Sequence, residues 1–318
     1  MTARSIPGFE MRRAKKWGWY VVLSGLLGLV DQSAFAQTTR PSVSASQVVQ
    51  SHTESEIGPP CSFDINGEYT FGSRLQDSHG LGHQSETRFE VEVLKNFRLT
   101  GNYYLQVGFD YERFDFSRSN DLYPYSLTGA NAEINFSYWS GDSYYPVIEI
   151  EPGIYYTRDH VTRNSFDVPI RLTPGFQLTK SLYVIGGCSI DPFNNPVVYP
   201  IAGLNWVINK QWNFRAVFPR PRLSYSPNDS LELYIGGELT GAGYRNGPTN
   251  DRRTNNAIVE YSSTRAGVGA NYTLRKGVSF EAVAGWTFER TTDYIRSGPV
   301  LNSRGSPYIR ADLSIDLF

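Results

Sequence analysis

Carboxylate side chains recur two residues apart in several segments of this chain, with one apolar residue between them. The pairs are Glu90 and Glu92, Asp110 and Glu112, and Glu149 and Glu151. In an extended strand, residues i and i+2 point to the same side of the backbone. Each pair would therefore place two carboxylates on one face of a strand. A cavity or pore lined by such faces would attract cations and repel anions.

Histidine offers little support for catalysis or metal binding. After the N-terminal segment the histidines are His52, His79, His83 and His160. His79 and His83 could bind a metal ion, but they stand in a Gly-rich stretch with no helix to hold their spacing. Asp159 and His160 could join an acid/base cluster at the rim of the fold. Solvated loop residues are the simpler interpretation of both pairs.

The sequence also shows no nucleotide-binding loop, no metal motif and no basic patch for nucleic acid. We therefore predict no catalytic, cofactor-binding or metal-binding residue and no nucleic-acid partner, so the chain is not expected to be an enzyme.

Alternating apolar and polar residues fill the chain after Cys61, and short polar turns interrupt them. The four lysines beyond residue 36, Lys95, Lys180, Lys210 and Lys276, each stand where one alternating run stops and another begins. Such a pattern indicates β-hairpins. The turns are predicted at 95–96, 141–142, 180–181, 209–210, 227–229 and 276–277.

Fourteen strands are predicted from this pattern, or twelve if a short pair around Pro219 and Pro221 does not reach across. The ranges are 63–71, 87–94, 99–112, 130–139, 145–157, 166–178, 182–190, 198–208, 212–218, 223–226, 231–243, 257–274, 278–290 and 307–318. Prolines inside these ranges, at 152, 169, 174 and 200, are expected to mark bulges or strand ends because proline removes a ladder hydrogen bond.

The connections sort by length, which favours a membrane barrel. Short turns alternate with longer polar stretches at 72–86, 115–129, 191–197, 244–256 and 291–306. Outer-membrane barrels have short periplasmic turns, long outer loops and an even number of strands. A soluble β-sandwich would not sort its loops this way. The predicted fold is an all-β, transmembrane, antiparallel up-and-down barrel of 12–14 strands over residues 61–318.

The N-terminal 36 residues are typical of a secretory signal peptide. Basic residues 12–16 precede an apolar stretch at 17–30, and Ala34-Phe35-Ala36 gives a cleavage site between Ala36 and Gln37. Residues 37–60 are rich in Ser, Thr, Gln and Pro and are predicted to be a disordered periplasmic tail. Apolar stretches elsewhere are too short to span a bilayer as helices.

The apolar face of each strand should contact lipid, so the alternate residues should line the lumen. The predicted inward acids are Asp64, Glu68, Glu90, Glu92, Asp110, Glu112, Glu133, Glu149, Glu151, Asp167, Glu232, Glu238, Glu281, Glu289, Asp312 and Asp316. The predicted inward bases are Arg88, Arg171, Arg215, Arg265 and Arg310. This excess of acids predicts a passage that favours cations.

A closed or plugged lumen is the alternative interpretation of the same residues. The carboxylates would then pair with the arginines, bind protons, or hold a water network. Inward Tyr104, Trp139, Tyr155, Tyr199, Tyr234 and Tyr261 would narrow the passage further. Outward Tyr138, Tyr144, Tyr156, Trp206, Trp212, Tyr272 and Trp286 are expected to form interfacial girdles.

Two segments resemble an uncharacterised family of bacterial outer-membrane β-barrels known as a domain of unknown function. One is Phe218-Pro219-Arg220-Pro221 with Tyr225 after it, and the other is 236–241, GGELTG, with Tyr244 after it. The resemblance implies a fold and a location in the outer membrane. It implies no reaction and no substrate, so it assigns no functional residue.

Together these observations predict a passive outer-membrane pore for small cationic or neutral solutes. A non-conducting barrel that acts through its outer loops is the second hypothesis, and a hydrolase at the outer rim is the third. The expected partners are outer-membrane lipid, small solutes, and the periplasmic chaperones and barrel-insertion machinery that assemble such proteins.

Overall fold

The computed structural model describes residues 60–76, 82–119, 122–138, 144–145, 147–295 and 298–317. These residues form antiparallel strands almost throughout, and a short helical turn, η3 (Arg163–Ser165), lies in a connection. No helix in the described ranges is long and apolar enough to cross a bilayer. The predicted signal peptide, its cleavage position and the tail up to residue 59 lie outside these ranges.

Nineteen strand segments are defined by their hydrogen bonding. They are β1 (Cys61–Arg74), β2 (His83–Arg98), β3 (Tyr103–Phe116), β4 (Ser126–Tyr138), β5 (Tyr144–Tyr145), β6 (Val147–Ile150), β7 (Gly153–Thr157), β8 (Phe166–Asp167), β9 (Ile170–Leu172), β10 (Gly175–Thr179), β11 (Leu182–Ile190), β12 (Val198–Val207), β13 (Trp212–Val217), β14 (Arg222–Asn228), β15 (Leu231–Arg245), β16 (Ile258–Arg275), β17 (Val278–Ile295), β18 (Val300–Ser303) and β19 (Ser306–Leu317).

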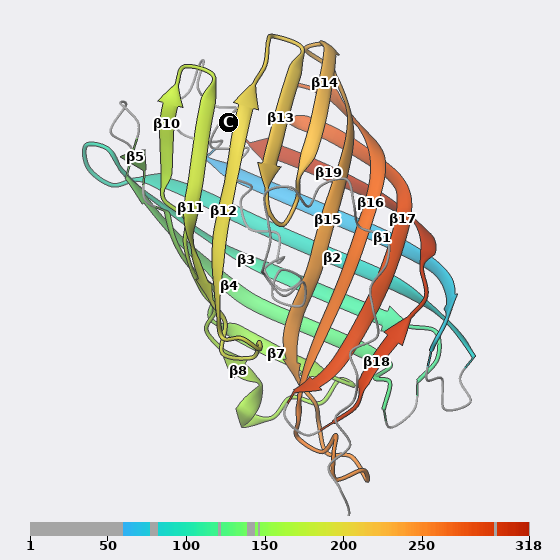
Figure 1. The fold of residues 1–318 in the computed structure, drawn as a ribbon. Helices are drawn as coiled ribbons and strands as arrows, with labels where there is room; N and C mark the ends of the chain where they lie inside the picture. The colour runs from blue at the N-terminus through green and yellow to red at the C-terminus, as the bar shows by residue number, and fades with distance from the viewer. Residues whose placement is uncertain are drawn as a thin grey trace, which may run out of the picture. The chain divides into compact units, whose positions relative to one another are not determined.

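These segments make a closed antiparallel barrel of fourteen strands, which confirms the predicted fold (Figure 1). β5, β6 and β7 are pieces of one strand, as are β8, β9 and β10, and β18 with β19. Three of the breaks fall at Pro152, Pro169 and Pro174, as expected for residues that cannot donate to the ladder. β1 closes the barrel on β19, from Cys61 opposite Leu317 to Thr70 opposite Tyr308.

Short turns gather at one end of the barrel together with the C-terminus, and we call this the turn end. The turns at 180–181 and 276–277 lie where the sequence predicts them. The prediction of a turn at Lys95 is wrong. β2 continues to Arg98, opposite Tyr104, and the chain reverses over residues 99–102. Apolar Phe97 and Leu105 extend the alternation there, so a lysine alone does not mark the turn.

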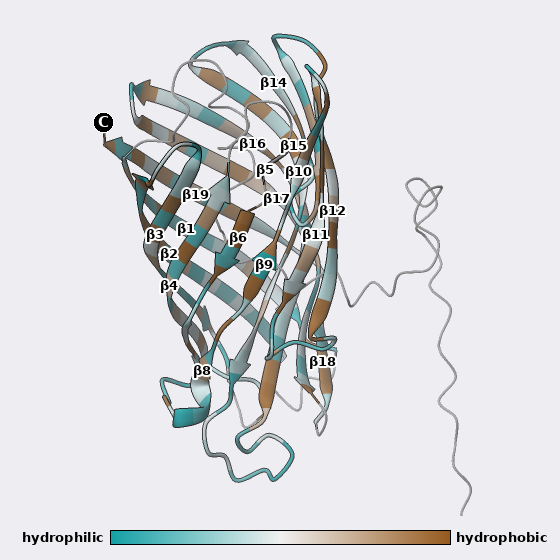
Figure 2. Cartoon of the chain, turned by 90° about the vertical axis from the view of Figure 1, so that its left-hand side faces the viewer, coloured by the Kyte–Doolittle hydropathy of each residue, from teal (hydrophilic) through white to brown (hydrophobic). Residues whose placement is uncertain are grey.

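The two faces of the wall differ as a membrane barrel requires. Along β2, Phe89 keeps 45% of its surface exposed, whereas its neighbour Glu90 keeps 4%. Large apolar side chains are exposed on the outside of most strands, and Figure 2 shows hydrophobic and hydrophilic residues alternating along them. Trp206, Trp212 and Trp286 are among these exposed side chains. Apolar surface of this extent is stable only against lipid.

The hairpin of β13 and β14 is shorter than its neighbours. β12 pairs with β13 only from Gly203 to Val207, and β14 pairs with β15 only up to Gly236. The turn of this hairpin, residues 218–221, therefore lies partway down the wall rather than at its far end. Its backbone carbonyls at Pro219 and Pro221 accept hydrogen bonds from Leu239 and Gly237 of β15.

At the opposite end, which we call the loop end, side chains close the lumen. Pairing of β7 with β8 ends at Ile154, and beyond it β7 meets β15, where Tyr156 lies opposite Arg245. A buried cluster fills this level and consists of Phe114, Leu127, Tyr155, Phe193, Ala242, Tyr244 and Tyr261. A second cluster consists of Leu75, Leu122, Tyr123, Val259, Tyr294 and Leu301.

Candidate functional site

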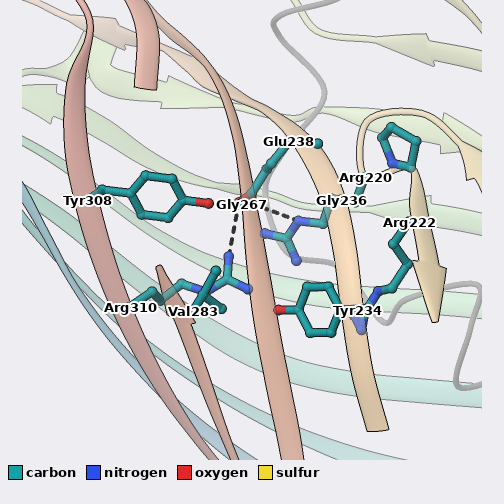
Figure 3. A pocket seen from close by; sticks show the side chains of 11 residues that line it. Arg220, Arg222, Tyr234, Gly236, Glu238, Gly267, Val283, Tyr308 and Arg310 are labelled. Carbon is teal, nitrogen blue, oxygen red and sulfur yellow. Dashed lines mark hydrogen bonds and ion pairs between the residues drawn. The ribbon is translucent and has the colours of Figure 1, made fainter. Parts of the chain in front are cut away.

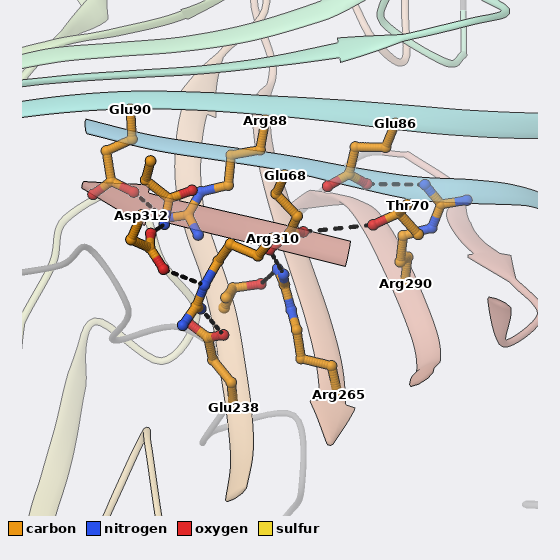
Figure 4. Close-up of polar contacts among 12 residues, drawn as sticks. Glu68, Thr70, Glu86, Arg88, Glu90, Glu238, Arg265, Arg290, Arg310 and Asp312 are labelled. Atoms are coloured by element: carbon orange, nitrogen blue, oxygen red, sulfur yellow. Dashed lines mark hydrogen bonds and ion pairs between the residues drawn. The ribbon is translucent and has the colours of Figure 1, made fainter. Parts of the chain in front are cut away.

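Charged side chains cross the middle of the lumen in a connected layer (Figure 4). The register places Glu68 opposite Arg88, and Glu90 opposite Glu112, on three neighbouring strands. The Arg88 guanidinium donates to Glu112 at 2.7 Å and forms an ion pair with Glu90 at 2.9 Å. Its side chain has no exposed surface. From the other side of the barrel, Arg265 donates to Glu68.

Arg310 extends this layer toward the turn end. Its guanidinium pairs with Glu238 at 2.9 Å, with Glu281 at 2.7 Å and with Asp312 at 3.0 Å. On the opposite wall, Arg171 of β9 contacts two of the predicted lumen acids, Glu149 at 2.8 Å and Glu151 at 3.0 Å. Buried charges of this kind are stable only when they are paired, because desolvation of a lone ion is costly.

One group of carboxylates has no basic partner among the described residues. Asp64, Glu92 and Asp110 lie side by side in the register of β1, β2 and β3, and Glu133 of β4 lies next to them. Glu92 and Glu133 hydrogen bond to each other, and the charged neighbours of both are other carboxyl groups. Asn131, opposite Asp110, is 2% exposed. We call Asp64, Glu92, Asp110 and Glu133 the acid row.

Toward the loop end, a further buried ion pair was not predicted. Arg290 of β17 pairs with Glu86 of β2 at 2.9 Å and also donates to Ser73 at 2.6 Å. The sequence instead predicts Glu289 on the inner face. A bulge at Phe288 of β17, between the pairs Arg265–Thr287 and Thr264–Glu289, shifts the register, so that Glu289 is half-buried and Arg290 is buried. Period-two alternation cannot reveal such a shift.

Two further lumen arginines are Arg220, in the turn between β13 and β14, and Arg222, the first residue of β14. Arg220 forms an ion pair with Glu238 at 2.8 Å, and Arg222 donates to Glu232 at 3.1 Å. Both flank Pro221, next to the segment that resembles the uncharacterised family. Sequence periodicity does not predict where their side chains point, because the alternation of apolar and polar residues stops at a turn. With Arg290, these arginines reduce the predicted excess of inward acids.

Most of the predicted lumen residues are buried, with Glu289 as an exception. The buried acids are Glu68, Glu90, Glu92, Asp110, Glu112, Glu133, Glu149, Glu151, Asp167 and Glu238, and the buried bases are Arg88, Arg171, Arg215 and Arg265. Glu232, Glu281 and Arg310 are half-buried. The structure thus brings the predicted acids together, and it pairs the majority of them with arginine.

The histidine hypotheses gain no support. Asp159 pairs with Arg113 at 2.6 Å, and this hydrogen bond lowers the pKa of the Asp159 carboxyl below its usual value. The carboxylate is therefore engaged by arginine. His83 is exposed at the start of β2, and His79 lies outside the described residues. The described side chains include no group of three or more His, Cys, Asp or Glu arranged for a metal ion.

A closed antiparallel wall with an apolar exterior and a charged interior defines an outer-membrane β-barrel. The match to a family model is specific. Residues 103–298 match the domain of unknown function DUF6268, and the chain belongs to this family. The matched range contains both segments on which the sequence resemblance rests, 218–221 and 236–241.

None of the curated proteins matches this sequence. Among solved structures, the chain is similar to a deletion mutant of the monoaromatic hydrocarbon channel TodX, with 11% identity, a TM-score of 0.46, and coverage of 84% of this chain and 92% of that one. An outer-membrane channel from Pseudomonas putida F1 gives 11% identity and a TM-score of 0.43, covering 81% and 95%. The NanC porin gives 10% identity and 0.38, covering 80% and 100%. We draw no functional conclusion from these likenesses.

Proposed function

We propose that the protein is a passive outer-membrane channel whose acidic lumen favours small cationic or neutral solutes. The acid row carries this proposal. It places four carboxyl groups on adjacent strands of one wall, and the described residues provide no arginine or lysine to neutralise them. Buried without a cation, these carboxyl groups are neutral in the conformation described here, and once the passage opens to water they would ionise and select ions of the opposite sign.

The conformation described here narrows the passage at the loop end. The Tyr244 hydroxyl donates to Glu112 on the far side of the lumen at 3.3 Å, and the rings of Phe114 and Tyr261 lie 5.2 Å apart between β3 and β16. Passage of a solute therefore requires these side chains to move. Side-chain rotation and small loop movements at this level would suffice, because the wall itself is fixed by its ladder.

A non-conducting barrel is the second candidate, and the central charged layer favours it. Arg88, Glu68, Glu90 and Glu112 are all almost inaccessible to solvent, so water does not fill the lumen at their level. In that case the arginine pairs would serve to seal and stabilise the barrel, and the loops at the loop end would carry the function.

Conductance in a planar bilayer separates these candidates. The refolded mature chain is measured with a salt gradient across the membrane, and heat-modifiable gel migration confirms its folding. We expect a reversal potential of the sign that indicates cation selectivity. Glu92→Gln and Asp110→Asn should shift it toward zero, whereas Asp251→Asn, in an exposed loop, should not. Anion selectivity, or row variants that leave the potential unchanged, would contradict the acid-row proposal. Absence of conductance from a folded barrel would favour the second candidate.

Export and membrane location are part of the same proposal. We expect cleavage between Ala36 and Gln37, followed by assembly through periplasmic chaperones and the barrel-insertion machinery. N-terminal sequencing of the protein from the outer-membrane fraction tests both points. Recovery of an uncleaved chain in the inner membrane would contradict them.

A further inference from the structure

A pocket opens from the lumen beside the short hairpin of β13 and β14 (Figure 3). The turn between the two strands supplies Arg220 and Pro221, β14 supplies Arg222, and β15 supplies Tyr234 and Glu238. Its cavity volume is about 40 Å³, and the pocket is open to solvent on one side. That space can hold the carboxylate group of a small solute, with the rest of the molecule in the open part.

The backbone fixes the position of this pocket. Hydrogen bonds from Leu239 to the Pro219 carbonyl (3.0 Å) and from Gly237 to the Pro221 carbonyl (2.9 Å) hold the turn against β15. Gly236 permits this approach, since a Cβ there would lie 2.9 Å from the Pro221 carbonyl oxygen. Arg220 is thereby held between two prolines and close to Glu238, as Figure 3 shows.

Arginine side chains form the accessible part of the pocket, and the carboxylate between them lies deeper. Arg220 keeps 34% and Arg222 keeps 25% of the side-chain surface exposed, whereas Glu238 keeps 6%. Glu238 also has a second cation, Arg310, at 2.9 Å. Arg222 stacks over the ring of Tyr234, with 4.3 Å from its guanidinium carbon to the ring centre, and its Nη1 pairs with Glu232 at 3.1 Å.

We propose that this pocket is a binding site for the carboxylate of a small solute. A planar guanidinium offers parallel N–H donors that match the two oxygens of a carboxylate. Arg220 and Arg222 present two such groups, separated by one residue. Val283 and Pro221 add an apolar surface for the carbon chain of the solute.

Together with the proposed function, on which this step rests, the pocket narrows the class of solute. The acid row repels solutes with net negative charge, whereas the pocket favours a carboxylate. Small zwitterions that carry both a carboxylate and an ammonium group satisfy both conditions.

Titration calorimetry on the refolded barrel in detergent tests this proposal without requiring conduction. The probes are γ-aminobutyrate, butyrate and butylammonium, which share a four-carbon chain and differ in charge. We expect γ-aminobutyrate to bind more tightly than either singly charged probe. Arg220→Gln should weaken its binding by about tenfold or more, the effect of losing one charge-assisted hydrogen bond.

Arg220→Gln is the suitable first variant because Glu238 keeps Arg310 as a partner. Arg222→Lys is the second, since it retains the charge but loses the planar donor pair, and it should also weaken binding. Arg253→Gln, which alters an exposed arginine paired with Asp251, is the matched control and should bind as the parent does.

Equal binding of γ-aminobutyrate by the parent and by both pocket variants would overturn the proposal, as would binding of butyrate as tight as that of the zwitterion. These outcomes are independent of the channel proposal. If the barrel conducts with cation selectivity but binds no carboxylate, the proposed function stands and this inference is wrong. If the barrel binds a carboxylate but does not conduct, this inference stands and the proposed function is wrong.

Discussion

Replacing Arg88 with methionine should destabilise the barrel strongly. The variant leaves Glu90 and Glu112 buried without their cation, at positions where their side chains are each 5% exposed. Removing one partner of a buried ion pair costs about 3–5 kcal/mol, because the remaining charge stays desolvated. At 1.4 kcal/mol per factor of ten, the ratio of folded to unfolded protein should fall by about two to three and a half orders of magnitude.

Arg113 provides a matched control on the adjacent strand. It also pairs with two carboxylates, Asp115 at 3.0 Å and Asp159 at 2.6 Å, but these keep 53% and 47% of their side-chain surface exposed. Exposed pairs contribute about 0–1 kcal/mol, so Arg113→Met should have a small effect. The two variants thus make the same chemical change and differ in burial.

Denaturant unfolding in lipid vesicles, followed by tryptophan fluorescence, measures both effects. We expect a lower midpoint for Arg88→Met at an unchanged slope. A triple variant that also carries Glu90→Gln and Glu112→Gln should recover much of the lost stability, because burying an amide costs less free energy than burying an unpaired carboxylate. If Arg88→Met and Arg113→Met shift the midpoint equally, the assignment of a dry, charge-paired layer at the centre of the lumen is wrong.

Three further predictions concern the loop end and the hairpin. Tyr244→Ala removes a ring that crosses the lumen, so single-channel conductance should rise, and an unchanged conductance would show that this ring does not limit passage. Gly236→Ala adds a Cβ 2.9 Å from the Pro221 carbonyl oxygen and should destabilise the barrel by about 1–3 kcal/mol, measured by denaturant midpoint. The pKa of Asp159 is lowered by Arg113, so its stabilising effect is present at neutral pH and is lost as the pH falls below about 4. The difference in unfolding free energy between the parent and Asp159→Asn should therefore be small at pH 7 and should shrink as the pH falls below about 4, and a difference that grows on acidification would contradict this.

Alternation along each hairpin correctly predicts which side chains face lipid and which face the lumen, because this choice depends only on the local sequence. A residue on a transmembrane strand faces either lipid or lumen, and lipid tolerates only apolar side chains. Phe89, Phe109 and Ile134 are thus correctly placed outward, and Glu90, Asp110 and Glu133 inward. Strand breaks fall at Pro152, Pro169 and Pro174 as predicted, but the prediction for Pro200 is wrong, because Pro200 pairs with Cys188 inside an unbroken β12.

The predictions fail where the local rule is interrupted. Lys95 does not mark a turn, since pairing continues to Arg98. Glu289 and Arg290 exchange roles after a bulge whose position depends on the partner strand. Arg220 lies in a turn and Arg222 directly follows it, so the directions of their side chains depend on the hydrogen bonds that hold the turn against β15.

The sequence by itself thus determined an even-stranded membrane barrel with an apolar exterior and an interior rich in carboxylates, because strand periodicity and the lipid environment act on each residue separately. The tertiary structure alone decided which carboxylates are neutralised. Arg265 reaches Glu68 over 197 residues of sequence, and Arg290 reaches Glu86 over 204. Such pairs form only when the barrel closes, and closure leaves the acid row without a described basic partner.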